Sequence, residues 1–295
     1  MGTNTLSQNI NQAIRDFDSV REAIINKGVE IPEGTPTSQY GAKIGEIQTG
    51  GGGGETPTKG FVPAEWDNDG YPTKGTLYGM TKVPMRFFYS ANGNSGQYFN
   101  LYNITFEKHI ESIEDYAFNG CKSLNWTSLP EKLSNLVSIG GDAFVGCKNL
   151  ALTSLPEGLT SIGNEAFWQC SKLALTSLPE GITKLPTYVF NGCTNLALTS
   201  LPEGLNIIGD NALRACTNLV LTSIPNGVTS IGTAAFYGCT GLTSLTIGSA
   251  IKTIGSNAFA NCPNLTSITI NRAEGAVTGA PWGATNAQIN WVGTN

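Results

Sequence analysis

The chain has 295 residues, a formal charge of −5 at pH 7 and only 13% charged residues. This balance offers no basic surface for tracking phosphates, so we expect no nucleic-acid partner. No apolar run approaches the ~18–20 residues needed to span a bilayer, so we expect no membrane insertion. Residues 1–18 lack the basic start and apolar core of a secretory signal, which predicts folding in a cytoplasm.

Residues 5–27 have the apolar pattern of an amphipathic helix. Their apolar side chains recur at alternating steps of four and three, as in a coiled-coil heptad. The seam consists of Leu6, Ile10, Ala13, Phe17, Val20 and Ile24. A stop signal follows at Lys27 and Gly28, and a second short helix is predicted within 37–48. The pattern predicts a helical anchor over residues 1–49 that forms a homotrimer or docks into a larger assembly. The alternative is a helix that packs on the chain's own body.

Two different segments follow the predicted anchor. Residues 50–54 are all glycine, which predicts a flexible linker. Residues 55–98 are rich in aromatic side chains and are interrupted by turn-forming Asp, Asn and Gly. Because the open end of a repeat array needs a cover, we expect this region to form a small β-rich cap.

The seven cysteines mark a repeat. They are separated by 26 residues once and then by 23 residues five times. They are Cys121, Cys147, Cys170, Cys193, Cys216, Cys239 and Cys262. A fixed period of 23 lies within the range of leucine-rich repeats.

Other residues keep the same phase as the cysteines. Phe or Leu stands three residues before each cysteine, a small residue stands before that, and Leu stands three residues after. Such a short unit cannot bury its apolar side chains alone, so the copies should stack into one continuous core. The segment after each cysteine alternates like a strand, and the Ala-Phe-x-x-Cys segment resembles one helical or 3₁₀ turn. The sequence therefore predicts a mixed α/β repeat, a leucine-rich-repeat solenoid of seven copies with an N-terminal helical anchor and a β-rich cap.

The pattern Ile-Gly-x-x-Ala-Phe-x-x-Cys-x-x-Leu over residues 99–271 resembles the BspA-type leucine-rich repeat. Residues 272–295 contain Gly-Ala-Pro-Trp-Gly-Ala-Thr-Asn, which is similar to segments that close such arrays, so a C-terminal cap is expected there. The resemblance implies surface-exposed binding proteins, namely bacterial adhesins or fibre and tail components of phage virions. It implies no catalytic residues, so we expect no enzyme.

The segment from Ala13 to Pro36 resembles the start of several phage virion proteins. This second resemblance implies a structural protein of the virion, made in the host cytoplasm. Its partners would be other virion proteins through the N-terminal segment, and a bacterial surface protein or glycan through the solenoid. The alternative is an adhesin of the BspA-like type at a bacterial cell surface.

Few residues are candidates for chemistry. Zinc sites place ligands two to four residues apart, and no two cysteines are that close, so the cysteines are expected to act as small buried hydrophobes. We expect no metal and no cofactor, and His109 has no catalytic partners in phase with it. The position two residues before each cysteine varies and holds Trp168, Arg214 and Tyr237, which are candidates for ligand binding. The alternative is that these are isolated surface side chains.

Overall fold

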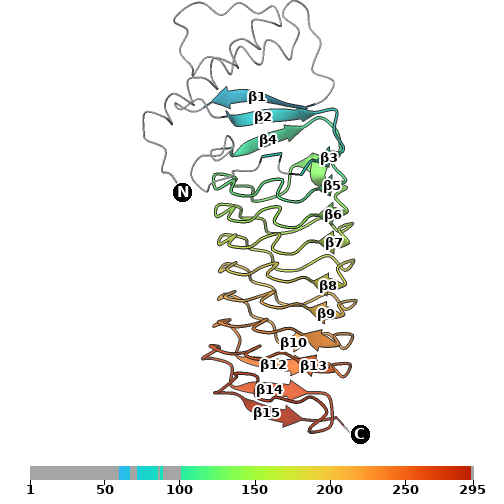
Figure 1. Cartoon of the computed structure of the whole chain (residues 1–295), viewed down its shortest axis with the longest axis vertical. Helices are drawn as coiled ribbons and strands as arrows, with labels where there is room; N and C mark the ends of the chain where they lie inside the picture. Colours follow the sequence, from blue (N-terminus) through green and yellow to red (C-terminus); the bar gives the residue numbers. More distant parts are fainter. Residues whose placement is uncertain (1–59, 67–71, 86, 89–100, 294–295) are drawn as a thin grey trace, which may run out of the picture.

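The computed structural model describes residues 60–66, 72–85, 87–88 and 101–293. The coils stack in chain order, with the β1–β2–β4 sheet at one end and β15 at the other (Figure 1). The two predicted N-terminal helices, their apolar seam and the glycine linker lie outside the described residues.

The prediction of a mixed α/β repeat is wrong. The described residues form strands and one 3₁₀ turn, η2 (Glu131–Leu133), with no α-helix among them. The Ala-Phe-x-x-Cys segment begins like a helical turn, because the Cys147 N–H donates to the Phe144 carbonyl at 3.0 Å. The next coil then takes the neighbouring donors: the N–H groups of Phe144 and Gly146 donate to the carbonyls of Ala166 and Trp168, both at 2.8 Å. Since each N–H has one proton to donate, these inter-coil bonds prevent a helix from continuing.

Short parallel strands occupy the position that precedes glycine in most coils, where the sequence pattern predicted no strand. Each has one outward residue and one buried aliphatic residue. The strands are β3 (Lys82–Val83), β5 (Ser112–Ile113), β6 (Ser138–Ile139), β7 (Ser161–Ile162), β8 (Lys184–Leu185), β9 (Ile207–Ile208), β11 (Ser230–Ile231) and β13 (Thr253–Ile254).

This series splits into two four-stranded sheets between β7 and β8. In most coils the glycine after the strand donates its N–H to the previous coil, as Gly163 does to the Ile139 carbonyl and Gly209 to the Leu185 carbonyl, both at 2.8 Å. Pro186 occupies the equivalent position in the β8 coil. Proline has no N–H, so the ladder loses a hydrogen bond at this step.

A further four-stranded sheet lies after the cysteines of the last coils. Its four parallel strands are β10 (Ser223–Ile224), β12 (Ser244–Ile247), β14 (Ser267–Ile270) and β15 (Gln288–Trp291). Here the predicted alternation is correct, because Leu245 and Ile247 are both buried. The middle coils differ: Leu152 and Leu155 are both buried, although they are three residues apart, because the chain bends at Thr153 between them.

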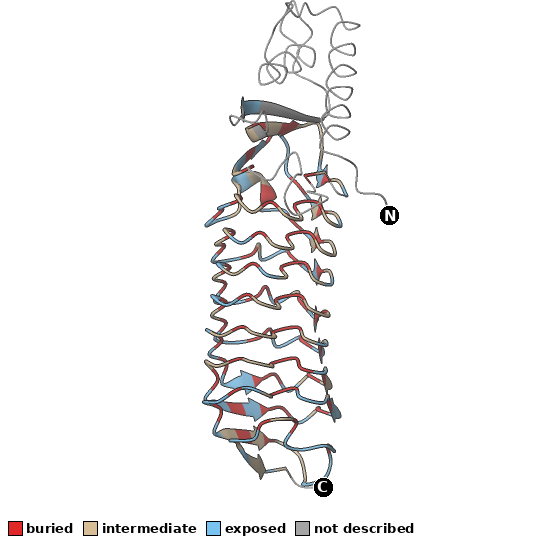
Figure 2. Cartoon of the chain, turned by 60° about the vertical axis from the view of Figure 1, so that its left-hand side comes forward, coloured by how far each residue is buried: buried red, intermediate tan, exposed pale blue. Residues whose placement is uncertain are grey.

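The core is a continuous column inside the coils, and buried and exposed residues alternate along each of them (Figure 2). Phenylalanine rings stack from coil to coil with centroids 5.0 to 5.6 Å apart. The first stack contains Phe88, Phe118, Phe144, Phe167 and Phe190; Leu213 interrupts it, and Phe236 and Phe259 form a second stack.

All seven cysteines are buried and unpaired, as the 23-residue phase predicted. Each thiol donates to a backbone carbonyl of the previous coil, as Cys193 Sγ does to the Phe167 carbonyl at 3.0 Å. The cysteines therefore join neighbouring coils through the interior.

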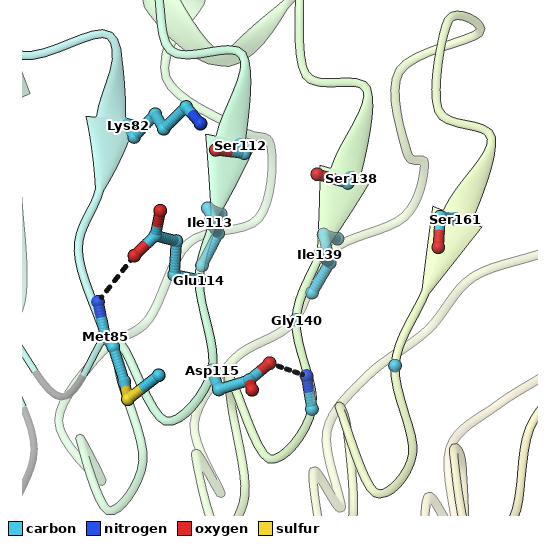
Figure 3. A pocket seen from close by; sticks show the side chains of 12 residues that line it. Lys82, Met85, Ser112, Ile113, Glu114, Asp115, Ser138, Ile139, Gly140 and Ser161 are labelled. Carbon is cyan, nitrogen blue, oxygen red and sulfur yellow. Dashed lines mark hydrogen bonds between the residues drawn. The ribbon is translucent and has the colours of Figure 1, made fainter.

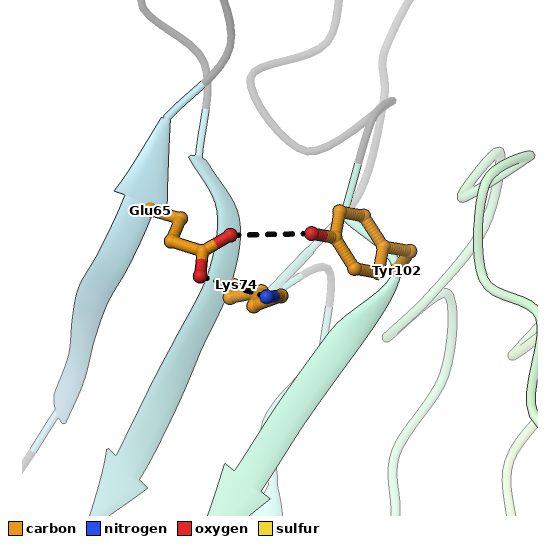
Figure 4. Close-up of polar contacts among 3 residues, drawn as sticks. All are labelled: Glu65, Lys74 and Tyr102. Carbon is orange, nitrogen blue, oxygen red and sulfur yellow. Dashed lines mark hydrogen bonds and ion pairs between the residues drawn. The ribbon is translucent and has the colours of Figure 1, made fainter.

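Both ends of the described array carry additional β-structure. At the N-terminal end, β2 (Pro72–Tyr78) lies between β1 (Gly60–Trp66) and β4 (Asn103–Phe106), as Figure 1 shows. Lys74 Nζ lies 2.7 Å from Glu65, and the Tyr102 hydroxyl donates to the same carboxylate at 3.2 Å, which ties the three strands together on the outside (Figure 4).

At the C-terminal end, the tryptophan-containing segment extends the column. The Phe259 N–H donates to the Trp282 carbonyl at 3.1 Å, as it would to a further coil. The Trp282 ring is almost fully buried and lies 6.3 Å from Trp291 of β15. This segment therefore covers the last phenylalanine ring.

Candidate functional site

The seven residues that stand two positions before the cysteines form a row along the solenoid, which we call the lateral edge. It consists of Asn119, Val145, Trp168, Asn191, Arg214, Tyr237 and Ala260. All are half-buried, whereas the Phe or Leu immediately before each of them and the cysteine two residues after each of them are buried in the core. From Val145 onward, the carbonyls of this row accept bonds from the preceding coil, for example Arg214 from Gly192 at 2.8 Å and Tyr237 from Ala215 at 2.7 Å. The backbone therefore holds this row in fixed register.

Two of the three predicted binding residues come together. The Arg214 guanidinium carbon lies 4.1 Å above the centre of the Tyr237 ring, a close cation–π contact. Arg214 Nη1 also donates to Asn211 Oδ1 at 3.4 Å, and Asn261 Nδ2 contacts the Tyr237 hydroxyl. Asp210 lies nearby in the sequence, but its carboxylate accepts the Thr233 N–H at 2.7 Å. Arg214 thus has no carboxylate partner among the described residues.

Trp168 lies apart from this pair. Its ring is 6.3 Å from the Tyr188 ring of the next coil, with the planes tilted by 42°. The coil of Asn191 separates Trp168 from Arg214 along the lateral edge. Since neighbouring strands are about 4.8 Å apart, Trp168 and Tyr237, three coils apart, are separated by about 14 Å along the solenoid.

Tyr188 is a candidate that the sequence interpretation missed. It stands five residues before a cysteine, in a row whose described members all have positive φ, from 53° to 59°. The residue type in this row varies from coil to coil as much as it does in the lateral edge. This variation is the sequence signal that would have marked Tyr188 as a candidate. The row brings Tyr188 beside Trp168 only because the coils stack.

Acidic residues occupy the row of Tyr188 in the two preceding coils. Burial raises the pKa of both Asp142 and Glu165, and the neighbouring Asp115 raises the pKa of Asp142 further. The charge along this side of the solenoid is therefore uneven, with carboxylates near Trp168 and a guanidinium two coils further on.

A shallow groove of about 580 Å³ runs over β3, β5, β6 and β7 (Figure 3). Its floor contains glycines that the stacking itself requires: a Cβ at Gly140 would lie 2.5 Å from the Asp115 backbone nitrogen. Two of its carboxylates are already engaged, because Glu114 accepts the Met85 N–H at 3.2 Å and Asp115 accepts the Gly141 N–H at 2.7 Å. Coil stacking therefore accounts for the shape of this groove.

The described residues offer little for catalysis. His109 is exposed, and no group of three or more His, Cys, Asp or Glu in this part of the chain could hold a metal ion. Burial raises the pKa of all seven thiols, so they stay protonated and shielded. Within the same residues, no helix is long and apolar enough to cross a membrane.

Comparisons with known proteins agree with the repeat. The family model described as a BspA type leucine rich repeat region matches residues 94–220 and 206–276 in six copies, which together span more than half of the chain. Among solved structures, the T. pallidum leucine-rich repeat protein is 26% identical, with 72% of this chain and 90% of that chain covered and a TM-score of 0.47. A leucine-rich cell surface protein from Faecalibacterium prausnitzii is 18% identical, with 81% and 94% covered and a TM-score of 0.44. Among curated proteins, none matches this chain.

Proposed function

The chain belongs to the BspA-type leucine-rich repeat family, and from this premise we propose that it is a non-enzymatic binding protein that uses its lateral edge. One observation carries the proposal. The inward positions repeat the same residue types in coil after coil, whereas the lateral edge changes among amide, aliphatic, aromatic and guanidinium side chains. Folding needs only the inward set.

The side chains on this edge have the chemistry of a binding surface. Trp, Tyr and Arg dominate binding hot spots because they combine a large contact area with few rotatable bonds or with several donors. Here they emerge from a backbone that the inter-coil hydrogen bonds hold rigid, so little conformational entropy is lost on binding. The partner that we propose is a protein or glycan of a bacterial surface.

The setting that we propose is a bacterial cell surface. The resemblance of Ala13–Pro36 to phage virion proteins favours a second setting, a virion. Detection of the native protein in fractionated cultures distinguishes the two: it is expected with intact cells and their envelope, and recovery only in sedimenting particles would favour the virion.

A cell-binding assay tests the function itself. Fluorescently labelled full-length protein is incubated with a panel of bacterial cells, and bound protein is measured by flow cytometry. Trp168→Ser combined with Tyr237→Ser is expected to lower binding at least tenfold, about the effect of one lost hot spot. The matched control is Val220→Ser, which changes an exposed aliphatic residue away from the lateral edge. Equal binding by all three proteins would exclude the lateral edge as the binding site.

A further inference from the structure

We propose that the lateral edge binds an acidic glycan. In this arrangement Arg214, held on Tyr237, takes the carboxylate or phosphate of the ligand, and the Trp168–Tyr188 pair stacks against one of its sugar rings. The inference rests on the proposed function and adds the chemical class of the ligand.

The first argument is the unused capacity of Arg214. A guanidinium has five N–H donors, and the contact with Asn211 uses one of them. The Tyr237 ring lies 4.1 Å from the central carbon of the group, and this contact together with that to Asn211 holds the guanidinium in place. A planar fork of this kind matches the two oxygens of a carboxylate or phosphate. Because no carboxylate of the described chain pairs with it, the group is available for an anion.

The second argument is the spacing between the Trp168–Tyr188 pair and the Arg214–Tyr237 pair. The first pair spans the coils of Cys170 and Cys193, and the second pair spans the next two coils, those of Cys216 and Cys239. The separation of about 14 Å between Trp168 and Tyr237 exceeds the size of a single anion or a single sugar ring. A ligand that uses both pairs is therefore an oligosaccharide lying along the solenoid axis.

The third argument is the distribution of charge. Glu165 stands in the same coil as Trp168, and Asp142 stands in the coil before it, further from Arg214. These carboxylates repel a uniformly anionic polymer, whereas a glycan with an acidic residue at Arg214 and a neutral residue at Trp168 avoids them. The expected ligand thus has alternating or scattered acidic groups.

The surroundings favour a glycan over a protein. The cores of protein interfaces are apolar, and none of the large exposed hydrophobic side chains of the described residues belongs to the lateral edge. They are Met85, Val137, Ile207, Val220 and Val292. Next to the aromatic pairs stand amides instead, namely Asn191, Asn211 and Asn261, which suit hydroxyl groups.

Isothermal titration of the full-length protein with defined glycans tests this inference. The probes are a hyaluronan hexasaccharide, which carries carboxylates between neutral rings, a hexasaccharide that carries phosphates between neutral rings, and neutral chitohexaose. We expect at least one acidic probe to bind at least tenfold more tightly than chitohexaose, and the preferred probe identifies the anion as carboxylate or phosphate. We also expect this binding to weaken as NaCl is raised from 0.05 to 0.5 M, since salt screens exposed charges.

Substitutions locate the site. Arg214→Gln is expected to lose at least tenfold affinity for the acidic probe, and Arg214→Lys is expected to be intermediate, because an ammonium retains the charge without the planar fork. Trp168→Ala is expected to weaken every glycan that binds. Lys184→Gln is the matched control, because it removes an exposed cation from β8 and should leave affinity unchanged.

Two results would overturn the inference: no preference for acidic over neutral glycans, or unchanged affinity in Arg214→Gln. Its failure is distinguishable from failure of the proposed function. If cells still require Trp168 and Tyr237 for binding while no acidic glycan binds, the lateral edge is the binding site of another ligand. If cell binding is also independent of these residues, both proposals fail.

Discussion

The inner column and the lateral edge are built from neighbouring residues of the same coils, yet they follow opposite rules. Phe167 and Trp168 are adjacent in sequence; the first is stacked between two rings of the core, and the second lies against a single ring at the surface. Inside, every coil repeats its neighbours because each side chain contacts its own equivalent above and below. Outside, no such contact restricts the residue type, so the edge is free to vary. Stability and recognition therefore occupy separate positions of one repeat, and each prediction below tests that separation.

The largest effect should come from raising the pH. Burial raises the pKa of the thiols in the folded state, whereas an unfolded thiol ionises near pH 8.5. Above that pH the unfolded chain binds fewer protons than the folded chain. The free energy of unfolding should therefore keep its maximal thiol contribution below about pH 8.5 and decrease as the pH rises above it. Each fully buried thiol contributes a slope of up to about 1.4 kcal/mol per pH unit. Urea unfolding at pH 7.5, 8.5 and 9.5 measures this fall.

A cysteine variant isolates the thiol contribution from that of lysine and tyrosine. The free energy of unfolding of Cys193→Ala should fall less steeply with pH than that of the parent protein. The difference should be the slope of one proton, because the thiol that the substitution removes is fully buried. Identical pH profiles for the two proteins would mean that the column admits water and hydroxide.

The adjacent pair Phe167 and Trp168 provides the next test. Phe167→Ala should lower the free energy of unfolding by roughly 3–5 kcal/mol, because it leaves a cavity between stacked rings. Trp168→Ser should lower it by less than about 1 kcal/mol, since surface positions contribute little. Chemical denaturation of both variants checks the contrast, and similar losses would show that the edge is part of the core.

Much of this organisation can be predicted from the sequence, and the errors have physical causes. The 23-residue phase identifies Phe167 and Cys193 as buried because a core position must recur once per coil. The mixed α/β class was wrongly predicted because local propensity contains no information about inter-coil bonds, such as that from Phe144 to Ala166, which stop the turn from continuing as a helix. The strands before the glycines are only two residues long, too short for an alternating pattern to be recognised.

The candidate site was only partly predictable. Trp168, Arg214 and Tyr237 are visible as variable residues in an otherwise regular repeat, but the sequence does not indicate that Arg214 lies on Tyr237. Tyr188 was missed because it occupies another position of the repeat, and its contact with Trp168 crosses from one coil to the next. Contacts between coils depend on the stagger of the stack, which the period alone does not specify.

A pair of glycines tests how tightly the coils approach each other. A Cβ at Gly163 would lie 2.3 Å from the Gly141 backbone nitrogen, whereas a Cβ at Gly158 would have nothing within 4 Å. Gly163→Ala should therefore cost about 1–3 kcal/mol through overpacking against backbone, and Gly158→Ala should change the free energy of unfolding by less than about 0.5 kcal/mol. Thermal unfolding of the two variants measures the difference. Equal midpoints would show that the coils can separate slightly without cost.

The smallest effect concerns the contact within the lateral edge itself. The guanidinium of Arg214 and the ring of Tyr237 form a half-exposed cation–π pair, and such pairs contribute about 0.5–1 kcal/mol at exposed sites. A double-mutant cycle with Arg214→Gln, Tyr237→Leu and the combined variant should give a coupling of that size in the free energy of unfolding. The same cycle measured on the affinity for an acidic glycan should give a larger coupling, because a ligand that needs the oriented guanidinium loses it with either substitution. A coupling in folding that exceeds the coupling in binding would assign the pair to the stability of the solenoid, and the separation between inner column and lateral edge would then fail at the residues where the binding proposal depends on it most.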